Sequence, residues 1–202
     1  MGTEAKKILV FVNYVMSTAD IFEYLTNNLE DKAFDGPPLS NNRVVEMFSA
    51  ATDAEDQRRI QIRFGKKGGS LKVVVATIAF GMGIDIPDID VTVQWGLPRS
   101  PLQFWQQAGR AGRDGRMALS ISYIFKRSVH LCTDKTMQAL ASDDEATCIR
   151  AKLLNVFSVN EAMCSELEKL KSATVCECAS ISDKEDVCNC PACQCCIVCV
   201  QQ

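Results

Sequence analysis

Short apolar runs alternate along the chain with segments in which apolar residues recur every three or four positions. Five of these runs have the length and the branched side chains of buried strands, namely residues 8–12, 44–48, 71–76, 91–95 and 118–125. Most of the segments between them have helical spacing. Because strands that alternate with helices form parallel sheets covered on both faces, the pattern predicts a doubly wound α/β domain.

Capping residues and apolar stripes place the first two helices. Ser17 is the predicted cap of the first helix, and Asp20 lies in its first turn, where the helix dipole favours an anion. Thr52 or Asp53 is the predicted cap of the second helix. The apolar positions of the two helices are Ile21, Leu25, Leu29, Ile60 and Phe64. Each helix therefore has one face that can pack on the sheet.

The loop after the third predicted strand has the composition of a ligand-binding loop. The apolar run ends in Thr77, and residues 78–85 then contain two glycines and one aspartate. Ligands of open α/β sheets bind beyond the carboxyl ends of the strands, where we expect this loop to lie. Gly83 lets the backbone come close to a ligand. Thr77, Gly83 and Asp85 are therefore candidate site residues.

A second glycine-rich segment, residues 106–115 with the sequence QQAGRAGRDG, carries two arginines three positions apart. Pro98 and Pro101 bracket the turn into a helix that we expect to end in this segment. If the segment is helical, Arg110 and Arg113 project from one face. Their planar guanidinium groups suit phosphate oxygens, and the small residues between them let a polyanion approach the backbone.

Together the two segments resemble motifs V and VI of superfamily-two helicases, and in particular of the RecQ branch. The sequence AFGMG at residues 79–83 is typical of that branch, and both motifs occur in the family's order and with its spacing. Helicases of the DEAD-box type usually have histidine where Gln106 stands. The resemblance implies a RecA-like doubly wound sheet over residues 1–127, the second lobe of such a helicase. Over residues 128–202 it implies a small helical, cysteine-rich region similar to the RecQ zinc-binding subdomain.

The resemblance also implies roles for the candidate residues at the nucleotide. Arg113 would act as the arginine finger for ATP, Arg110 would hold the same phosphates, and Gln106 would link the nucleotide to the interface between lobes. Gly83 and Asp85 would lie at the nucleotide as well. Members of this family use ATP with Mg²⁺ to move along DNA in the 3′→5′ direction during repair, recombination and replication.

Three residues are expected to contact single-stranded DNA. The resemblance implies that the Thr77 hydroxyl binds a DNA phosphate, and Arg99 and Ser100 in the turn before the arginines are further candidates. The sequence departs from the family at residues 14–17, where a Ser-Arg pair is usual, and at residues 48–50, where His-Ala-Gly is usual. We therefore assign no DNA contact to those two loops.

No phosphate-binding loop of the form G-x-x-x-x-G-K-[ST] occurs in the 202 residues. We therefore expect an ATPase site only in combination with a first RecA-like lobe as partner, and no ATPase activity from these residues alone. The alternative is a regulatory module that binds DNA or docks on a helicase without ATPase activity. No apolar run approaches the ~18 residues of a membrane span, so no membrane partner is expected. For a eukaryotic source the resemblance implies the nucleus.

Charge and cysteine are unevenly distributed along the chain. Residues 1–127 carry a net charge of +2, and residues 128–202 carry a net charge of −5. None of the 11 cysteines precedes Cys132, and six of them lie between residues 188 and 199. This change in composition marks a domain boundary.

The clustered cysteines have the close spacing of zinc ligands. The resemblance implies that Zn²⁺ is held by one cysteine at the start of a helix and three in the cluster, which here are Cys148, Cys190, Cys193 and Cys196. Cysteines 193, 196 and 199 have the same spacing, so the ligand set stays open. A thiol-rich end without metal, a mis-spliced terminus and disulfides are the alternatives.

Overall fold

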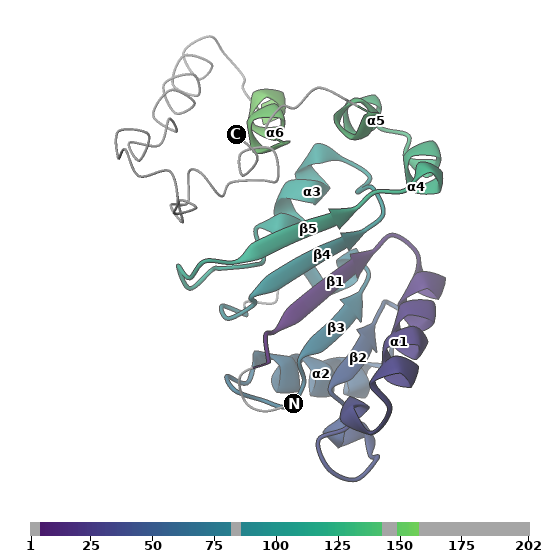
Figure 1. The fold of residues 1–202 in the computed structure, drawn as a ribbon, viewed down its shortest axis with the longest axis vertical. Helices are drawn as coiled ribbons and strands as arrows, with labels where there is room; N and C mark the ends of the chain where they lie inside the picture. Colours follow the sequence, from purple (N-terminus) through teal and green to yellow (C-terminus); the bar gives the residue numbers. More distant parts are fainter. Residues whose placement is uncertain (1–4, 82–85, 143–148, 158–202) are drawn as a thin grey trace, which may run out of the picture. The chain divides into compact units, whose positions relative to one another are not determined.

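The computed structural model of the chain describes residues 5–81, 86–142 and 149–157. The chain divides into two units, residues 1–141 and 142–202. In the first unit, five parallel strands form one sheet in the order β2-β3-β1-β4-β5 (Figure 1). The strands are β1 (Ile8–Val12), β2 (Val45–Phe48), β3 (Val73–Ala76), β4 (Val91–Trp95) and β5 (Leu119–Tyr123). The predicted parallel sheet is therefore confirmed.

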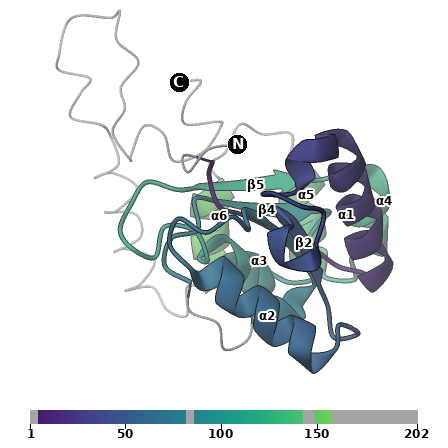
Figure 2. The same ribbon diagram turned by 90° about the horizontal axis from the view of Figure 1, so that it is seen from below.

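Helices cover both faces of this sheet, with α1 on one face and α2 and α3 on the other (Figure 2). Successive residues of a strand point to opposite faces. Val10 and Val12 of β1 therefore pack with α1, whereas Leu9 and Phe11 pack with α2. The helices are α1 (Val15–Leu29), α2 (Ala54–Gly65) and α3 (Pro101–Ala108). This is the doubly wound arrangement that the pattern predicted.

The predicted apolar stripes are the positions that pack on the sheet. Ile21, Leu25 and Leu29 of α1 are partly buried against the valines of the strands. Ile60 and Phe64 of α2 are buried on the opposite face, with 1% and 0% exposure. Burying an apolar side chain of this size stabilises the fold by about 1.5–3 kcal/mol, so these positions fix both helices to the sheet.

The N-terminus of α2 is capped as predicted, by Asp53. Its Oδ1 atom accepts hydrogen bonds from the backbone nitrogens of Glu55 at 3.0 Å and Asp56 at 2.9 Å. The bond from the Asp56 nitrogen is the main reason that the pKa of Asp53 lies below its usual value. The cap thus satisfies two of the four free N–H groups at the helix start.

The predicted cap of α1 was wrong. The helix begins at Val15 and not after Ser17, and Tyr14 occupies the N-cap position without a side-chain hydrogen bond. The backbone nitrogen of Ser17 donates instead to the carbonyl oxygen of Tyr14, at 3.1 Å. The chain passes from β1 into the helix through two residues, so the tertiary path sets the start of α1 and overrides the capping preference of serine.

Helix α3 ends within the arginine segment, as expected, and Arg110 and Arg113 lie beyond its last residue rather than on one helical face. Helix α3 has Ser100 as its N-cap, whose Oγ accepts from the Gln103 nitrogen at 3.2 Å, and it ends at Ala108. Residues 109–116 follow as a series of tight turns, here called the arginine turn. Gly112 and Gly115 have φ angles of +68° and +82°, which an α-helix excludes.

The remaining elements are short. They are the 3₁₀ turns η1 (Glu30–Ala33), η2 (Ser40–Asn42) and η3 (Ile78–Gly81), the helices α4 (Lys126–Leu131) and α5 (Lys135–Ser142) after β5, and α6 (Ile149–Phe157) in the second unit. Helix α6 is the helix that was expected directly after Cys148. In the described part of the chain, every helix is too short or too polar to cross a bilayer.

Candidate functional site

A pocket of about 570 Å³ lies at the carboxyl edge of the sheet, where β1, β4 and β5 end. Its lining includes three aromatic and two basic side chains, Tyr14, Trp95, Phe125, Arg99 and Arg127. The aromatic residues are 42–47% exposed, which is high for side chains of this size. Exposed aromatic faces beside cations are the combination that binds the bases and phosphates of single-stranded nucleic acids.

Contacts on two sides hold Arg99 at this pocket. Its Nη2 atom donates to the carbonyl oxygen of Asn13 at 3.0 Å, and its guanidinium lies 5.6 Å from the centre of the Tyr14 ring. The backbone nitrogen of Arg99 donates to Oε1 of Gln103 at 3.2 Å. Ser100 follows directly and caps α3. Of the two residues predicted from this turn, Arg99 therefore lines the pocket, and Ser100 lies next to it in the chain as the cap of α3.

Thr77 lies at the same edge, directly after β3. Its backbone nitrogen donates to the carbonyl oxygen of Phe48 at the end of β2, and its carbonyl oxygen accepts from the nitrogen of Phe80, both at 3.1 Å. The residue is 9% exposed. Because all five strands are parallel, Thr77 after β3 and the turn with Arg99 and Ser100 after β4 lie at the same edge of the sheet, where the loop after Thr77 was expected.

The arginine turn lies at the opposite, amino edge of the sheet. Helix α3 carries the chain back from the end of β4, and the nitrogen of Gly112 then donates to the carbonyl oxygen of Ile89, two residues before β4 begins, at 3.0 Å. A Cβ atom on Gly112 would lie 2.8 Å from the carbonyl oxygen of Arg116. Only glycine fits this turn without a backbone shift.

An ion-pair chain ties the arginine turn to the strands. Arg116 donates from Nε to Oδ2 of Asp114 at 2.6 Å and from Nη1 to Oδ1 of Asp90 at 3.2 Å. Oδ2 of Asp90 accepts from the backbone nitrogen of Lys7 at 2.7 Å. The hydrogen bond between the side chains of Asp114 and Arg116 is the main cause that lowers the pKa of Asp114 and raises that of Arg116. These pairs are exposed, so they orient the turn more than they stabilise the fold.

The three residues predicted to act on ATP are arranged around the end of α3. Gln106 is exposed on the last turn of the helix, Arg110 is half-buried, and Arg113 is exposed. The Nε atom of Arg113 donates to the carbonyl oxygen of Gly109 at 3.4 Å. The structure therefore brings both arginines onto one turn, and it separates that turn from the carboxyl-edge residues by the length of the strands.

Six predicted site residues, Gly83, Asp85, Cys148, Cys190, Cys193 and Cys196, lie outside the described residues. Within the described ranges, no group of three or more His, Cys, Asp or Glu side chains is arranged to hold a metal ion. The sequence analysis missed Tyr14, Trp95, Phe125 and Arg127. A signal for three of them was present, because Tyr14, Trp95 and Phe125 lie at or just beyond the ends of predicted strands.

A doubly wound parallel sheet with an arginine turn after its fourth strand defines the class of RecA-like helicase lobes. The family model "Helicase conserved C-terminal domain" matches residues 2–115, and the chain belongs to this family. Its curated relatives include ATP-dependent DNA helicases of the RecQ type. It is 47% identical over 74 residues to the human ATP-dependent DNA helicase Q4 and 34% identical over 91 residues to the ATP-dependent helicase SGS1 of Saccharomyces cerevisiae.

These matches cover 37% and 45% of this chain, and each covers 6% of the relative. The chain thus spans a small fraction of the relatives' length. Among solved structures, helicase Lhr of Mycobacterium smegmatis bound to ssDNA and AMP-PNP matches with a TM-score of 0.51 and 20% identity, over 83% of this chain and 23% of that one. Dbp5 of S. cerevisiae bound to RNA and ADP BeF3 matches with a TM-score of 0.51 and 18% identity, over 85% of this chain and 39% of that one. These similarities show the fold.

Proposed function

We propose that this chain is the second motor lobe of an ATP-dependent 3′→5′ DNA helicase of the RecQ type, and that it works with a first RecA-like lobe. The observation that carries the proposal is the arginine turn, which presents Arg110 and Arg113 from a backbone that leaves no room for a side chain at Gly112. A fixed turn with two guanidinium groups is suited to a phosphate chain bound by another lobe.

At the nucleotide, the lobe's own contribution is charge and position. Bound ATP with Mg²⁺ supplies the phosphoryl group, and Arg113 would neutralise the charge that develops on it, while Arg110 would hold the neighbouring phosphates. Gln106, exposed on the last turn of α3, would contact the other lobe. The chain of bonds through Asp114, Arg116 and Asp90 keeps the turn in one orientation, so that little reorganisation is needed when the lobes close.

At the carboxyl edge, the proposal assigns the DNA strand to the pocket and its surroundings. Arg99 would bind a phosphate, and the hydroxyl groups of Thr77 and Ser100 would add neutral hydrogen bonds to the backbone. The exposed face of Tyr14 would stack on a base. Contacts of these kinds do not depend on base identity, as a motor that moves along any sequence requires.

Binding of single-stranded DNA by the 202-residue chain tests this assignment. We expect Tyr14→Leu to weaken binding of a fluorescein-labelled oligothymidine by about tenfold, because base–aromatic stacking contributes about 1–3 kcal/mol per base. The affinity would be measured by fluorescence anisotropy at fixed salt. Tyr24→Leu is the matched control, since Tyr24 is 66% exposed on α1 and does not line the pocket.

Equal affinities for the Tyr14 and Tyr24 variants would contradict the placement of DNA at the carboxyl edge. The result also separates two functions. A chain that binds DNA but gives no ATPase activity when combined with a competent first lobe would be a binding module, the alternative that the sequence left open.

We also propose that the cysteine-rich region binds one zinc ion through Cys148, Cys190, Cys193 and Cys196. Support comes from the spacing of these residues and from helix α6, which starts directly after Cys148. We expect about one zinc per chain by mass spectrometry of the purified, reduced protein, and a large loss in Cys148→Ser. Cys132→Ala is the control, because this thiol is buried in the first unit beside Leu97 and Met137. Zinc near zero in the unmodified chain would exclude the site.

A further inference from the structure

A second hollow, of about 440 Å³, opens at the C-terminal end of α2, beside the loop before β2 and the start of β3. We call it the α2 hollow. Its polar lining consists of Asn41, Arg59, Arg63, Lys66 and Ser70, together with the backbone of Gly69. No residue of the arginine turn or of the carboxyl-edge pocket lines it. The proposed motor function makes no use of this region.

Helical geometry gathers three cations at this hollow. Arg59 and Arg63 are four positions apart on α2, and Lys66 follows three positions later, directly after the helix. Residues spaced by three or four lie on the same side of a helix. The three positive charges therefore line one wall, although the negative end of the α2 dipole lies there too and offsets part of their charge.

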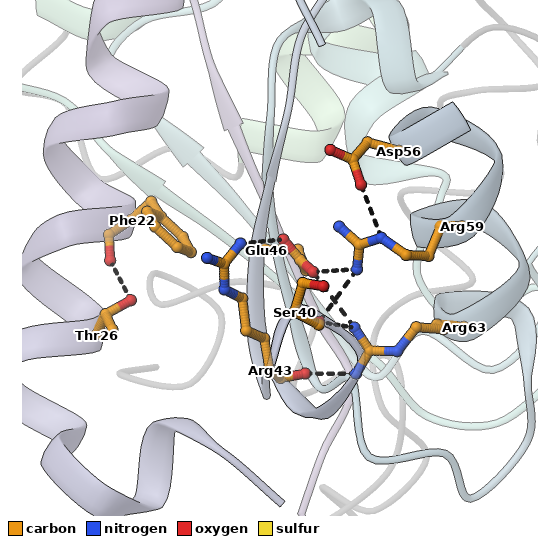
Figure 3. Close-up of polar contacts among 8 residues, drawn as sticks. All are labelled: Phe22, Thr26, Ser40, Arg43, Glu46, Asp56, Arg59 and Arg63. Carbon is orange, nitrogen blue, oxygen red and sulfur yellow. Dashed lines mark hydrogen bonds and ion pairs between the residues drawn. The ribbon is translucent and has the colours of Figure 1, made fainter. Parts of the chain in front are cut away.

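Beneath the hollow, the arginines converge on one buried carboxylate (Figure 3). Oε1 of Glu46, whose side chain is 3% exposed, accepts from Nη1 of Arg59 at 2.6 Å and from Nη1 of Arg63 at 3.3 Å. Arg43 forms an ion pair with Oε2 at 3.6 Å. Asp56 accepts from Nε of Arg59 at 2.8 Å. Two carboxylates thus face four cations when Lys66 is included.

Arg59 and Arg63 line the hollow, and each keeps a donor atom that forms no hydrogen bond with another described residue. Arg59 uses Nε and Nη1 for its bonds to Asp56, Glu46 and the Ser40 carbonyl oxygen, and Arg63 uses Nη1 and Nη2 for Glu46 and two carbonyl oxygens. Among the described residues, Nη2 of Arg59 and Nε of Arg63 have no acceptor within hydrogen-bond distance. Each is an N–H group of a rigid planar fork that suits an oxyanion.

The surroundings shift the pKa values of the two arginines in opposite directions. Burial, with the nearby charges of Arg59 and Arg43, lowers the pKa of Arg63 despite its contact with Glu46. Burial opposes ionisation of Arg59 too, but the hydrogen bonds to Glu46 and Asp56 outweigh it and raise the pKa. A bound anion would favour the charged form of Arg63.

We propose that the α2 hollow binds a phosphate group, carried by the DNA backbone or by a free phosphate compound. A phosphate presents several oxygens around one centre, which suits a hollow whose lining includes the donor groups of Arg59, Arg63, Lys66 and Ser70. A single carboxylate has two oxygens and would leave part of this set unused. The residues of this site differ from those assigned to ATP and DNA in the proposed function. An experiment can therefore contradict one of the two proposals and leave the other standing.

Amide NMR of the ¹⁵N-labelled 202-residue chain, titrated with inorganic phosphate at constant ionic strength, tests the site. We expect saturable shifts of the Gly69 and Ser70 amides. Lys66→Gln should weaken binding by about fivefold, because exposed ion pairs contribute up to ~1 kcal/mol. Lys67→Gln is the matched control, since Lys67 is the adjacent exposed lysine and does not line the hollow, and it should change affinity by less than about twofold.

A parallel titration with dimethyl phosphate distinguishes the two sources. Affinity equal to or above that of inorganic phosphate supports the diester of a DNA backbone, and much weaker binding supports a phosphate monoester or free phosphate. The proposal is overturned if the shifts are linear in phosphate and the same with chloride, or if the variants of Lys66 and Lys67 bind alike. Retained dispersion of the amide spectrum in both variants shows that their folds are intact.

Discussion

An Arg113→Ala variant of this lobe, joined to a competent first RecA-like lobe, is expected to bind ATP with nearly unchanged affinity and to lose DNA-stimulated hydrolysis by about 10³-fold or more. Arg113 is exposed on a turn that Gly112 and Ile89 fix to the amino edge of the sheet. In the proposed role, its positive charge would act mainly as the bond between the β- and γ-phosphates breaks, and less in the ground state. Phosphate release under saturating ATP and DNA, with nucleotide affinity measured separately, provides the two values.

The control for this experiment is Arg58→Ala. Arg58 is an exposed arginine on α2 of the same lobe, and its removal changes the net charge equally. Hydrolysis by the Arg113 variant within about threefold of the unmodified protein would remove the residue from the catalytic role. A parallel loss of ATP affinity would instead indicate that Arg113 holds the ground state.

Replacing Glu46 by alanine is expected to lower the free energy of unfolding of the chain by about 3 kcal/mol. The substitution removes one buried carboxylate and leaves Arg59 and Arg63 beside each other with no charge between them. Loss of one partner of a buried ion pair costs about 3–5 kcal/mol, and we take the lower limit because these arginines are 16–19% exposed. Urea denaturation followed by circular dichroism measures the difference.

Glu55→Ala is the matched control, because Glu55 is exposed in the first turn of α2 and makes no side-chain ion pair in the described structure. We expect a change within about 0.5 kcal/mol for this variant. A Glu46→Ala change as small as that would mean that water or Asp56 compensates the arginines, and that Glu46 does not organise the cluster.

The sheet and its two faces could be predicted because the signals are local. Apolar runs with period two or with no polar interruption place the strands, and the positions of Ile21 and Ile60 place the helix faces. Asp53 could be identified as a cap because it directly precedes a helical pattern, and because its side chain bonds only to backbone nitrogens two and three residues later. The start of α1 at Val15 could not, since it depends on the short path from β1 and has no side-chain cap.

The position of Thr77 at the carboxyl edge could be predicted for the same reason, since it directly follows a strand, whereas the pocket residues Tyr14, Trp95, Phe125 and Arg127 were missed. The place of the arginine turn could not be predicted. It depends on the hydrogen bond between Gly112 and Ile89, residues that are far apart in the sequence, and on the positive φ angles of Gly112 and Gly115, which exclude a helix through these two positions. The Glu46 cluster was equally inaccessible, because its arginines come from a loop and a helix that meet only in the folded chain.

The separation of the two edges has a mechanical consequence. A five-residue strand such as β4 is ~16 Å long, which exceeds the ~8 Å over which salt solution screens exposed charges. Charges at one edge therefore have little direct influence on the other. Helix α3 connects the two, since it starts beside Arg99 and ends beside Arg110. A short helix is stiff, so under the proposed function α3 would act as a rod. A shift of the turn that contains Arg99 at one end would displace the guanidinium groups of the arginine turn at the other.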